Sequence, residues 1–188
     1  MRIITGIARG RRLLCPEGLG TRPILDAQKQ ALFNVLGDRA VVDGVVDVFA
    51  GSGGLGLEAL SRGSEHATFI ERGKPALDCL RQNIENCNFS ECSQVIASDV
   101  YKVDWSRLTR PISLAFIDAP FPMFVDDRPR LEKLLMTVVE VPIVAVGATI
   151  VWRMPDDAVE VPIPPALVID DVREYGRSRI FLLTKTVA

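Results

Sequence analysis

Short apolar runs alternate with amphipathic stretches over most of the chain. The apolar runs predict strands at residues 44–49, 67–70, 94–97, 112–117 and 145–152. Apolar side chains at helical spacing, together with capping signals, predict helices at residues 25–36, 55–62, 75–86 and 130–139. Strands that alternate with helices are typical of a parallel sheet with helices on both faces. We therefore expect an α/β fold.

Both ends of the chain depart from this alternation. Residues 2–7 and 11–15 have the composition of two short strands, which predicts a small N-terminal β-hairpin. After a proline-rich stretch, residues 167–175 and 178–184 form two apolar runs around a Gly-Arg turn, which predicts a closing antiparallel hairpin. The expected architecture is a mostly parallel seven-stranded sheet with a C-terminal antiparallel strand.

Length and composition fit one globular unit. The chain has 188 residues, of which 48% are hydrophobic and 24% are charged, enough apolar material for one large core. At roughly 150 residues per domain, we expect a single domain over residues 1–188, with residues 1–20 forming a hairpin extension.

The cysteines and the single histidine exclude several classes of site. The four cysteines have no paired spacing typical of zinc sites, and His66 alone cannot form a multi-histidine centre. The first residues lack the apolar run of an export signal, and no stretch has the length and apolar character of a membrane span. We expect a cytoplasmic monomer without a metal or a membrane segment.

A glycine-rich turn follows the first predicted parallel strand. Gly51, Ser52 and Gly53 lie between that strand and a helix, where small residues let a ligand approach the backbone closely. Glu71 comes 20 residues after Gly51, at the end of the next predicted strand, where its carboxylate can accept from both ribose hydroxyls. A tight strand-to-helix connection is the alternative interpretation, but the pairing with Glu71 favours a ribose-containing ligand.

Two further carboxylates bear on which nucleoside binds. Asp47, near the end of the strand, would repel the pyrophosphate of a dinucleotide but attract the ammonium group of S-adenosylmethionine. Asp99 can accept from an adenine amino group, and it can equally be the N-cap of the segment that follows. No Lys-Ser/Thr pair follows the glycines, which disfavours a nucleoside triphosphate.

A second turn, Asp118-Ala119-Pro120-Phe121, follows the strand at residues 112–117. An exocyclic amine of a nucleobase is a poor nucleophile because its lone pair is delocalised into the ring. The carboxylate of Asp118 and the carbonyl of Ala119 can accept its two hydrogens and direct its lone pair. Phe121 can stack on a base swung out of its helix. A proline turn with a buried aromatic ring is the structural alternative.

These motifs resemble those of the RsmD-type 16S ribosomal RNA guanine-N2 methyltransferases, a family of class I S-adenosylmethionine-dependent enzymes. The resemblance covers nearly the whole chain and is densest over residues 47–63. It implies a Rossmann-like class I methyltransferase fold and S-adenosylmethionine as cofactor. The implied reaction is methyl transfer to the exocyclic N2 amine of a guanine in small-subunit ribosomal RNA, and the implied partner is that RNA or the small subunit.

The resemblance also implies roles for individual residues. The cofactor would be bound by Asp47, Phe49, Gly51, Ser52, Gly53, Glu71, Asp99 and Val100. The target guanine would lie against Asp118, Ala119, Pro120 and Phe121.

The chain departs from the family pattern at two places. Ala119 replaces the first proline of the usual Asp-Pro-Pro-Phe or Asp-Pro-Pro-Tyr turn, which keeps the carbonyl but loosens the turn. Residues 22–27 lack the hydroxyl and the cation of the family's Arg-Pro-Thr-x-Asp-Arg segment. These changes leave open a weakened or retargeted paralogue that binds S-adenosylmethionine and RNA. A DNA or protein N-methyltransferase and a dinucleotide oxidoreductase also remain open as functions.

The formal charge of −2 is unevenly distributed. Residues 1–40 hold seven basic and three acidic side chains, a balance of +4, which leaves −6 for the rest of the chain. Four of the first 12 residues are arginines and none is acidic, which predicts a small phosphate-binding surface. The arginines expected to bind RNA are Arg2, Arg9, Arg11, Arg12 and Arg22.

Overall fold

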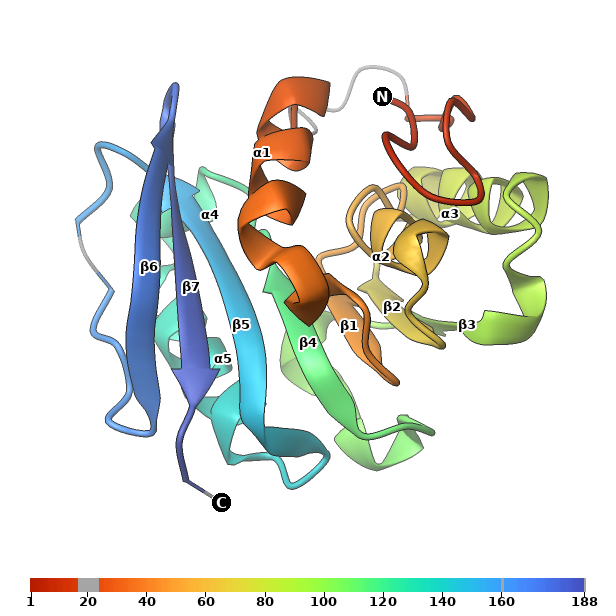
Figure 1. The fold of residues 1–188 in the computed structure, drawn as a ribbon. Helices are drawn as coiled ribbons and strands as arrows, with labels where there is room; N and C mark the ends of the chain where they lie inside the picture. The colour runs from red at the N-terminus through yellow and green to blue at the C-terminus, as the bar shows by residue number, and fades with distance from the viewer. Residues whose placement is uncertain (17–23, 160, 188) are drawn as a thin grey trace.

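The computed structural model describes residues 1–16, 24–159 and 161–187. Seven strands form one sheet in the order β3-β2-β1-β4-β5-β7-β6 (Figure 1). The strands are β1 (Val45–Val48), β2 (Ala67–Glu71), β3 (Ser93–Ala97), β4 (Ile112–Ile117), β5 (Val144–Pro155), β6 (Leu167–Tyr175) and β7 (Ser178–Lys185). The pairs among β1 to β5 are parallel, whereas β7 is antiparallel to both β5 and β6. The predicted mostly parallel sheet with an antiparallel C-terminal strand is confirmed.

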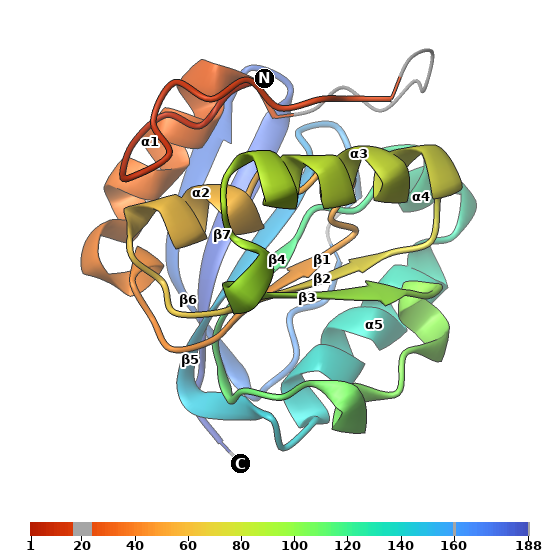
Figure 2. The same ribbon diagram turned by 90° about the vertical axis from the view of Figure 1, so that its right-hand side faces the viewer.

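Helices cover both faces of this sheet. The α-helices are α1 (Asp26–Leu36), α2 (Gly56–Arg62), α3 (Lys74–Asn86), α4 (Met123–Asp126) and α5 (Arg128–Glu140). Short 3-10 helices are η1 (Gly37–Ala40), η2 (Ser90–Cys92), η3 (Val100–Lys102) and η4 (Trp105–Arg107). Figure 2 shows α1, α2 and α3 on one face and α5 on the other. The short helix α4 is absent from the sequence prediction because four residues are too few to show a helical period.

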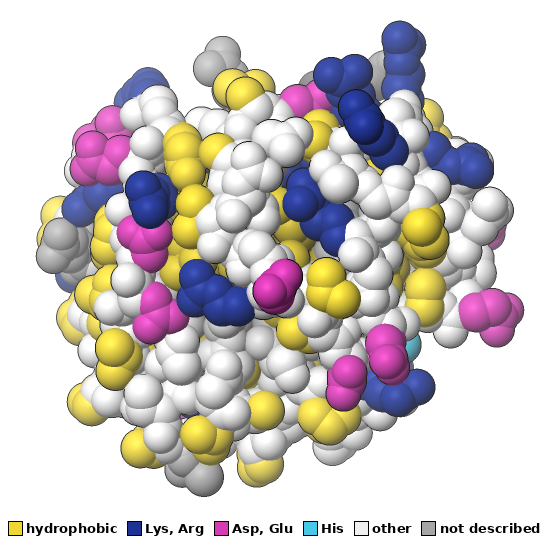
Figure 3. Space-filling view, viewed as in Figure 1, with side chains coloured by type: hydrophobic (Ala, Val, Ile, Leu, Met, Phe, Trp, Pro, Cys, Tyr) yellow, Lys and Arg dark blue, Asp and Glu magenta, His cyan; other side chains and the backbone are white. Residues whose placement is uncertain are grey.

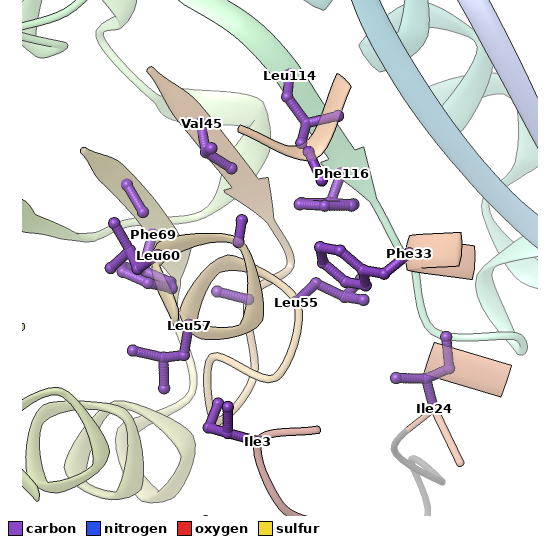
Figure 4. Packing of buried hydrophobic residues seen from close by; sticks show 14 of the residues in the cluster. Ile3, Ile24, Phe33, Val45, Leu55, Leu57, Leu60, Phe69, Leu114 and Phe116 are labelled. Carbon is purple, nitrogen blue, oxygen red and sulfur yellow. The ribbon is translucent and has the colours of Figure 1, made fainter. Parts of the chain in front are cut away.

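Two apolar clusters fill the spaces between the sheet and its helices. Successive strand residues point to opposite faces, so Leu114 and Phe116 join one cluster while Ala115 and Ile117 join the other. In the first cluster the ring of Phe33 on α1 meets that of Phe116, with 5.7 Å between centroids (Figure 4). Burial on both faces explains why the central strands appear in the sequence as continuous apolar runs.

The N-terminal segment (residues 1–16) forms less pairing than the predicted hairpin. A single antiparallel bridge joins Arg2 to Arg12, and no strand is formed within the segment. The backbone amides of Ile4 and Thr5 instead donate to the carboxylate of Glu58 on α2, at 2.8 and 3.0 Å. These donors are bound to a helix side chain rather than to a facing strand, so the hairpin prediction is wrong in its extent.

Parallel pairing brings several predicted site residues to one edge of the sheet. In the register of the strands, Val48 is opposite Ile70 on one side and Ile117 on the other. Ile117 is in turn opposite Trp152 of β5. The segments that follow these strands therefore meet at the carboxyl edge, which is where α/β proteins bind ligands.

Candidate active site at the carboxyl edge of the sheet

The glycine-rich loop between β1 and α2 has a backbone that few side chains tolerate. Phe49, Gly51 and Gly53 all have positive φ angles, of 64°, 55° and 87°. A Cβ at Gly53 would lie 2.6 Å from Cδ1 of Leu80, so this glycine is required for packing against α3. A Cβ at Gly51 would meet no atom of the described residues within 4 Å. The loop is thus packed against the protein at Gly53 and open to solvent or a ligand at Gly51.

Hydrogen bonds at two residues of the loop hold its conformation. Ser52 is buried, and its carbonyl accepts from the side-chain amide of Asn83 at 2.9 Å. The backbone amide of Gly53 donates to the carbonyl of Ala50 at 2.8 Å. The turn therefore keeps its conformation through contacts with the protein itself, which is the preorganisation that a binding loop needs.

Asp47 lies behind this loop rather than on its surface. Its side chain is buried, and Oδ2 accepts from the amide of Gly56, the first residue of α2, at 2.9 Å. Burial is the main cause that raises the pKa of Asp47 to about 8; the nearby carboxylates of Asp118 and Glu71 add to the shift, and the Gly56 hydrogen bond opposes it. Asp47 therefore positions the start of α2, and below about pH 8 it is a largely neutral acid that can ionise when a cation binds beside it.

Glu71 connects the loop to the start of α3. One carboxylate oxygen accepts from the amide of Gly51 at 2.8 Å, and the other accepts from the amides of Arg72 and Gly73 at 2.8 and 2.7 Å. Three backbone donors thus fix the orientation of this carboxylate at the end of β2. The predicted proximity of Glu71 to the glycine-rich loop is confirmed.

Asp99 lies at the N-terminus of the short helix η3, after β3. Its Oδ1 accepts from the amide of Tyr101 at 3.1 Å, so the N-cap interpretation is confirmed. Its Oδ2 accepts from Nη1 of Arg72 at 3.0 Å. Burial favours the neutral acid, but the Tyr101 hydrogen bond and the Arg72 charge outweigh it and lower the pKa of Asp99. Val100, the next residue, is buried in the core.

Asp118 begins the turn that follows β4. Its Oδ1 accepts from Nε of Arg153, at the end of β5, over 2.7 Å. Burial raises the pKa of Asp118, and the charge and hydrogen bond of Arg153 oppose this shift. Ala119 is buried, whereas Pro120 and Phe121 are partly exposed. The turn therefore presents a carboxylate and an aromatic ring at the same edge as the glycine-rich loop.

Arg153 is the residue of this site that the sequence prediction misses. Its guanidinium carbon lies 4.9 Å from the centroid of the Phe121 ring, so one side chain contacts both ends of the turn. The predicted strand ends at residue 152, and the observed strand continues to Pro155. One signal in the sequence could have indicated Arg153: it is a charged residue directly after the apolar run of a predicted strand. In α/β proteins the ends of neighbouring strands line the ligand site.

The predicted arginines have different environments. Arg2 donates from Nε to Asp26 on α1 at 3.1 Å, and Arg11 donates to the backbone carbonyl of Asn86 on α3. Arg9 and Arg12 are exposed. Arg2 and Arg9 also border a cavity of about 190 Å³ on the N-terminal segment. Arg22 lies outside the described residues.

A buried ion pair joins this segment to the glycine-rich loop. Lys29 on α1 and Glu58 on α2 are fully buried, and Nζ of Lys29 lies 3.3 Å from Oε2 of Glu58. The same ammonium donates to the carbonyls of Arg2 and Gly54, at 2.7 and 3.3 Å. Glu58 also pairs with Arg62 at 3.0 Å. The position of the N-terminal segment is therefore coupled to the loop.

Within residues 1–16, 24–159 and 161–187, the His, Cys, Asp and Glu side chains form no group that could hold a metal ion. None of the helices in these ranges is long and apolar enough to cross a membrane.

Comparison with known proteins gives the family. A family model described as "Conserved hypothetical protein 95" matches residues 1–184. The chain belongs to this family. Its relatives identify the family as that of the RsmD-type methyltransferases, as the sequence resemblance predicts.

Curated relatives match about two thirds of the chain. It is 36% identical over 123 residues to "Putative rRNA methyltransferase YlbH" of Bacillus subtilis, covering 64% of this chain and 67% of that protein. It is 38% identical over 121 residues to "Ribosomal RNA small subunit methyltransferase D" of Escherichia coli K12, covering 64% of this chain and 60% of that protein. The match thus spans 67% of the first relative's length and 60% of the second's.

A solved structure extends the similarity to the whole chain. The structure of "Putative methyltransferase yhhF from Escherichia coli" has 28% identity and a TM-score of 0.82, and the match covers 99% of this chain and 98% of that chain. The fold is therefore the Rossmann-like class I methyltransferase fold, as predicted.

Proposed function

We propose that this protein transfers a methyl group from S-adenosylmethionine to the exocyclic N2 amine of a guanine in small-subunit ribosomal RNA. The supporting observation is the turn at Asp118, whose carboxylate and aromatic neighbour Phe121 lie at the carboxyl edge of the sheet beside the glycine-rich loop. The names of the curated relatives, which include ribosomal RNA small subunit methyltransferases, support the same substrate class.

The residues around the glycine-rich loop fit a cationic nucleoside. The open space at Gly51 gives a ligand access to the backbone, and Glu71 beside it is a carboxylate suited to ribose hydroxyls. Asp47, Glu71 and Asp118 place three carboxyl groups near one another, and a positively charged ligand favours their ionised forms. The residues proposed to hold S-adenosylmethionine are Asp47, Phe49, Gly51, Ser52, Gly53, Glu71, Asp99 and Val100.

S-adenosylmethionine supplies an electrophilic methyl group when bound. The protein's part is to make the amine of the base a better nucleophile. Within the described chain, Oδ2 of Asp118 and the carbonyl oxygen of Ala119 take part in no hydrogen bond, so both are free to accept from the amine. Two acceptors draw the nitrogen toward tetrahedral geometry and direct its lone pair. The nitrogen becomes strongly acidic after attack, and Asp118 or water takes its proton.

The rest of the turn holds the target base. Phe121 is partly exposed, and its ring offers a face on which an extruded base stacks. Pro120 restricts the backbone next to Ala119. Ala119 is itself buried, so packing limits the freedom that the missing proline would otherwise give. We propose Asp118, Ala119, Pro120 and Phe121 as the residues that contact the guanine.

The N-terminal segment supplies the proposed RNA contact. Its exposed guanidinium groups carry positive charge beside an otherwise acidic chain, which suits contacts to phosphates. The arginines assigned to this contact are Arg2, Arg9, Arg11, Arg12 and Arg22. The partner is ribosomal RNA, free or in the small subunit.

Asp118→Asn tests the reaction. The amide keeps the shape of the side chain but replaces a charged acceptor, so we expect methyl transfer to unmodified small subunits to fall by about 10²-fold or more. Affinity for S-adenosylhomocysteine, measured by calorimetry, should remain close to that of the wild type. Asp126→Asn, at an exposed carboxylate on α4, is the matched control and should retain full activity.

Three outcomes would overturn the proposal. Undiminished transfer by Asp118→Asn would remove Asp118 from the reaction. Wild-type protein that binds S-adenosylhomocysteine but gives no product in a single turnover would instead be a binding protein, the alternative that Ala119 in the turn favours. Binding of NAD in preference to S-adenosylhomocysteine would indicate an oxidoreductase.

A further inference from the structure

Arg153 lies where the ends of β4 and β5 meet. The register places Ile117 opposite Trp152, so the next residues along the two strands, Asp118 and Arg153, are also neighbours. Their side chains form a hydrogen-bonded ion pair of 2.7 Å and are 19% and 11% exposed. A charge-assisted hydrogen bond that is this short and this shielded restricts both side chains.

The same guanidinium also contacts the aromatic ring of the turn. It lies 4.9 Å from the centroid of Phe121, within the range of a cation–π interaction. Arg153 donates to Oδ1 of Asp118, so Oδ2 is the oxygen that remains for another donor. One side chain from β5 therefore orients both groups that the proposed function assigns to the target base.

We propose that Arg153 is a positioning residue of this methyltransferase, which holds the carboxylate of Asp118 and the ring of Phe121 in the orientation that receives the target base. This inference rests on the proposed function. Arg153 acts through these two side chains. The proposal assigns it no contact with the reacting amine.

The charges around Asp118 show why this position needs a cation. Burial favours the protonated form of Asp118, and among the described residues Arg153 supplies the charge that opposes this effect. Asp47 on β1, whose pKa Asp118 and Glu71 both raise, is an acid, and Arg72, a cation that follows β2, pairs with Asp99. Without Arg153, Asp118 would be a buried carboxyl group close to the carboxyl group of Asp47. Such a group has a raised pKa and stays protonated up to a higher pH.

Arg153→Met and Arg153→Lys separate charge from shape. Methionine keeps much of the side-chain length but removes the charge, so Asp118 should need a higher pH to ionise. We expect the single-turnover rate of Arg153→Met, relative to wild type, to rise at least about tenfold between about pH 6 and about pH 9. Asp47 titrates in both proteins, so the ratio of the two rates cancels its contribution.

Lysine keeps the charge but lacks the planar guanidinium that pairs with Asp118 and stacks on Phe121. Arg153→Lys should follow the wild-type pH profile at a rate several-fold lower, roughly threefold to tenfold. Arg107→Met, on the exposed helix η4 at the opposite edge of the sheet, is the control and should match the wild type at every pH. A pH profile of Arg153→Met that superimposes on the wild-type profile overturns the proposal, as does a shifted profile for Arg153→Lys.

A second measurement does not depend on activity. Carbon-13 NMR of labelled aspartate, with the Asp118 signal assigned through Asp118→Asn, gives the titration midpoint of this carboxyl group. The midpoint should be at least about one pH unit higher in Arg153→Met than in the wild type. An unchanged midpoint in a variant that still binds S-adenosylhomocysteine overturns the inference. Absence of methyl transfer by the wild type would overturn the proposed function instead, so the two failures are distinguishable.

Discussion

At the scale of single residues, Asp47 lowers the stability of the fold by an amount that depends on pH. Its carboxyl group has a pKa of about 8 in the folded protein, raised from an ordinary value of 3.8 by burial. Between these two values the unfolded chain loses its proton while the folded protein retains it. The folded state binds more protons, so Asp47 lowers stability progressively as the pH rises from about 4 to about 8. A residue that served folding alone would not carry this cost.

Asp47→Asn should therefore stabilise the fold. An asparagine can still accept from the amide of Gly56, and it has no proton to lose. We expect its unfolding free energy, measured by urea denaturation, to exceed that of the wild type by an amount that grows with pH up to about pH 8. Calorimetry should show weaker binding of S-adenosylhomocysteine, because asparagine cannot ionise to attract the ligand's ammonium group. A stability difference that does not change with pH would contradict this account.

Strand ends made several site residues predictable. Glu71, Asp99 and Asp118 each follow an apolar run, so their meeting at one edge could be expected from the parallel sheet alone. The burial of Asp47 could not be predicted from the sequence, because it depends on how α2 packs over β1. Arg153 was missed because its role depends on which strand lies beside β4, and the sequence gives no strand order.

At the scale of elements, the buried pair of Lys29 and Glu58 joins α1, α2 and the N-terminal segment. Glu58→Gln removes one charge and leaves Lys29 buried without its counter-ion, so we expect a loss of about 3–5 kcal/mol in unfolding free energy. The double variant Lys29→Met/Glu58→Gln should recover part of that loss. Urea denaturation of the wild type, the single variants Glu58→Gln and Lys29→Met, and the double variant measures the coupling.

An exposed ion pair is the control for this prediction. Asp78→Asn disrupts the pair with Lys74 on the surface of α3 and should change the unfolding free energy by about 0.5 kcal/mol or less. The interpretation would be wrong if Glu58→Gln cost no more than this control. It would also be wrong if the losses in the Lys29 and Glu58 variants simply added.

Most helices and strands were more predictable than the N-terminal segment. Strands β4 and β6 have the predicted bounds, and α1 and α3 begin within one residue of theirs, because burial and capping leave local signals. The N-terminal segment was predicted as a hairpin because its alternation resembles two strands. The backbone amides of Ile4, Thr5 and Ala8 instead bond to side chains of α2, an interaction between distant residues that leaves no local pattern.

At the scale of the whole molecule, part of the basic charge gathers in one region of the surface. Figure 3 shows Lys and Arg side chains gathered at the upper right, over the place that the N-terminal segment and α3 occupy in Figure 1. Arg2 and Arg11 of this segment contact other residues, whereas Arg9 and Arg12 are exposed. A small basic surface of this kind binds phosphates without requiring a basic protein.

Arg9→Gln/Arg12→Gln should weaken RNA binding and its dependence on salt. Removing one phosphate contact reduces the slope of log affinity against log salt by roughly 0.7–0.9, so substituting two arginines should lower it by up to about 1.8. Fluorescence titration of a small-subunit ribosomal RNA fragment at several salt concentrations measures the slope. Arg107→Gln/Arg110→Gln, at the opposite edge of the sheet, should leave it unchanged. Equal slopes for all three proteins would exclude the N-terminal segment as the phosphate contact.

The contacts of the N-terminal segment also set an order of folding. The segment is synthesised first, but Glu58, which accepts from the amide of Ile4, follows 54 residues later. Ser61, which accepts from Ala8, follows 53 residues after that residue. The segment can reach its native position only after α2 has been made and Glu58 has been brought into place. The amides of Ile4 and Ala8 thus do not both have these partners until residue 61 has been made.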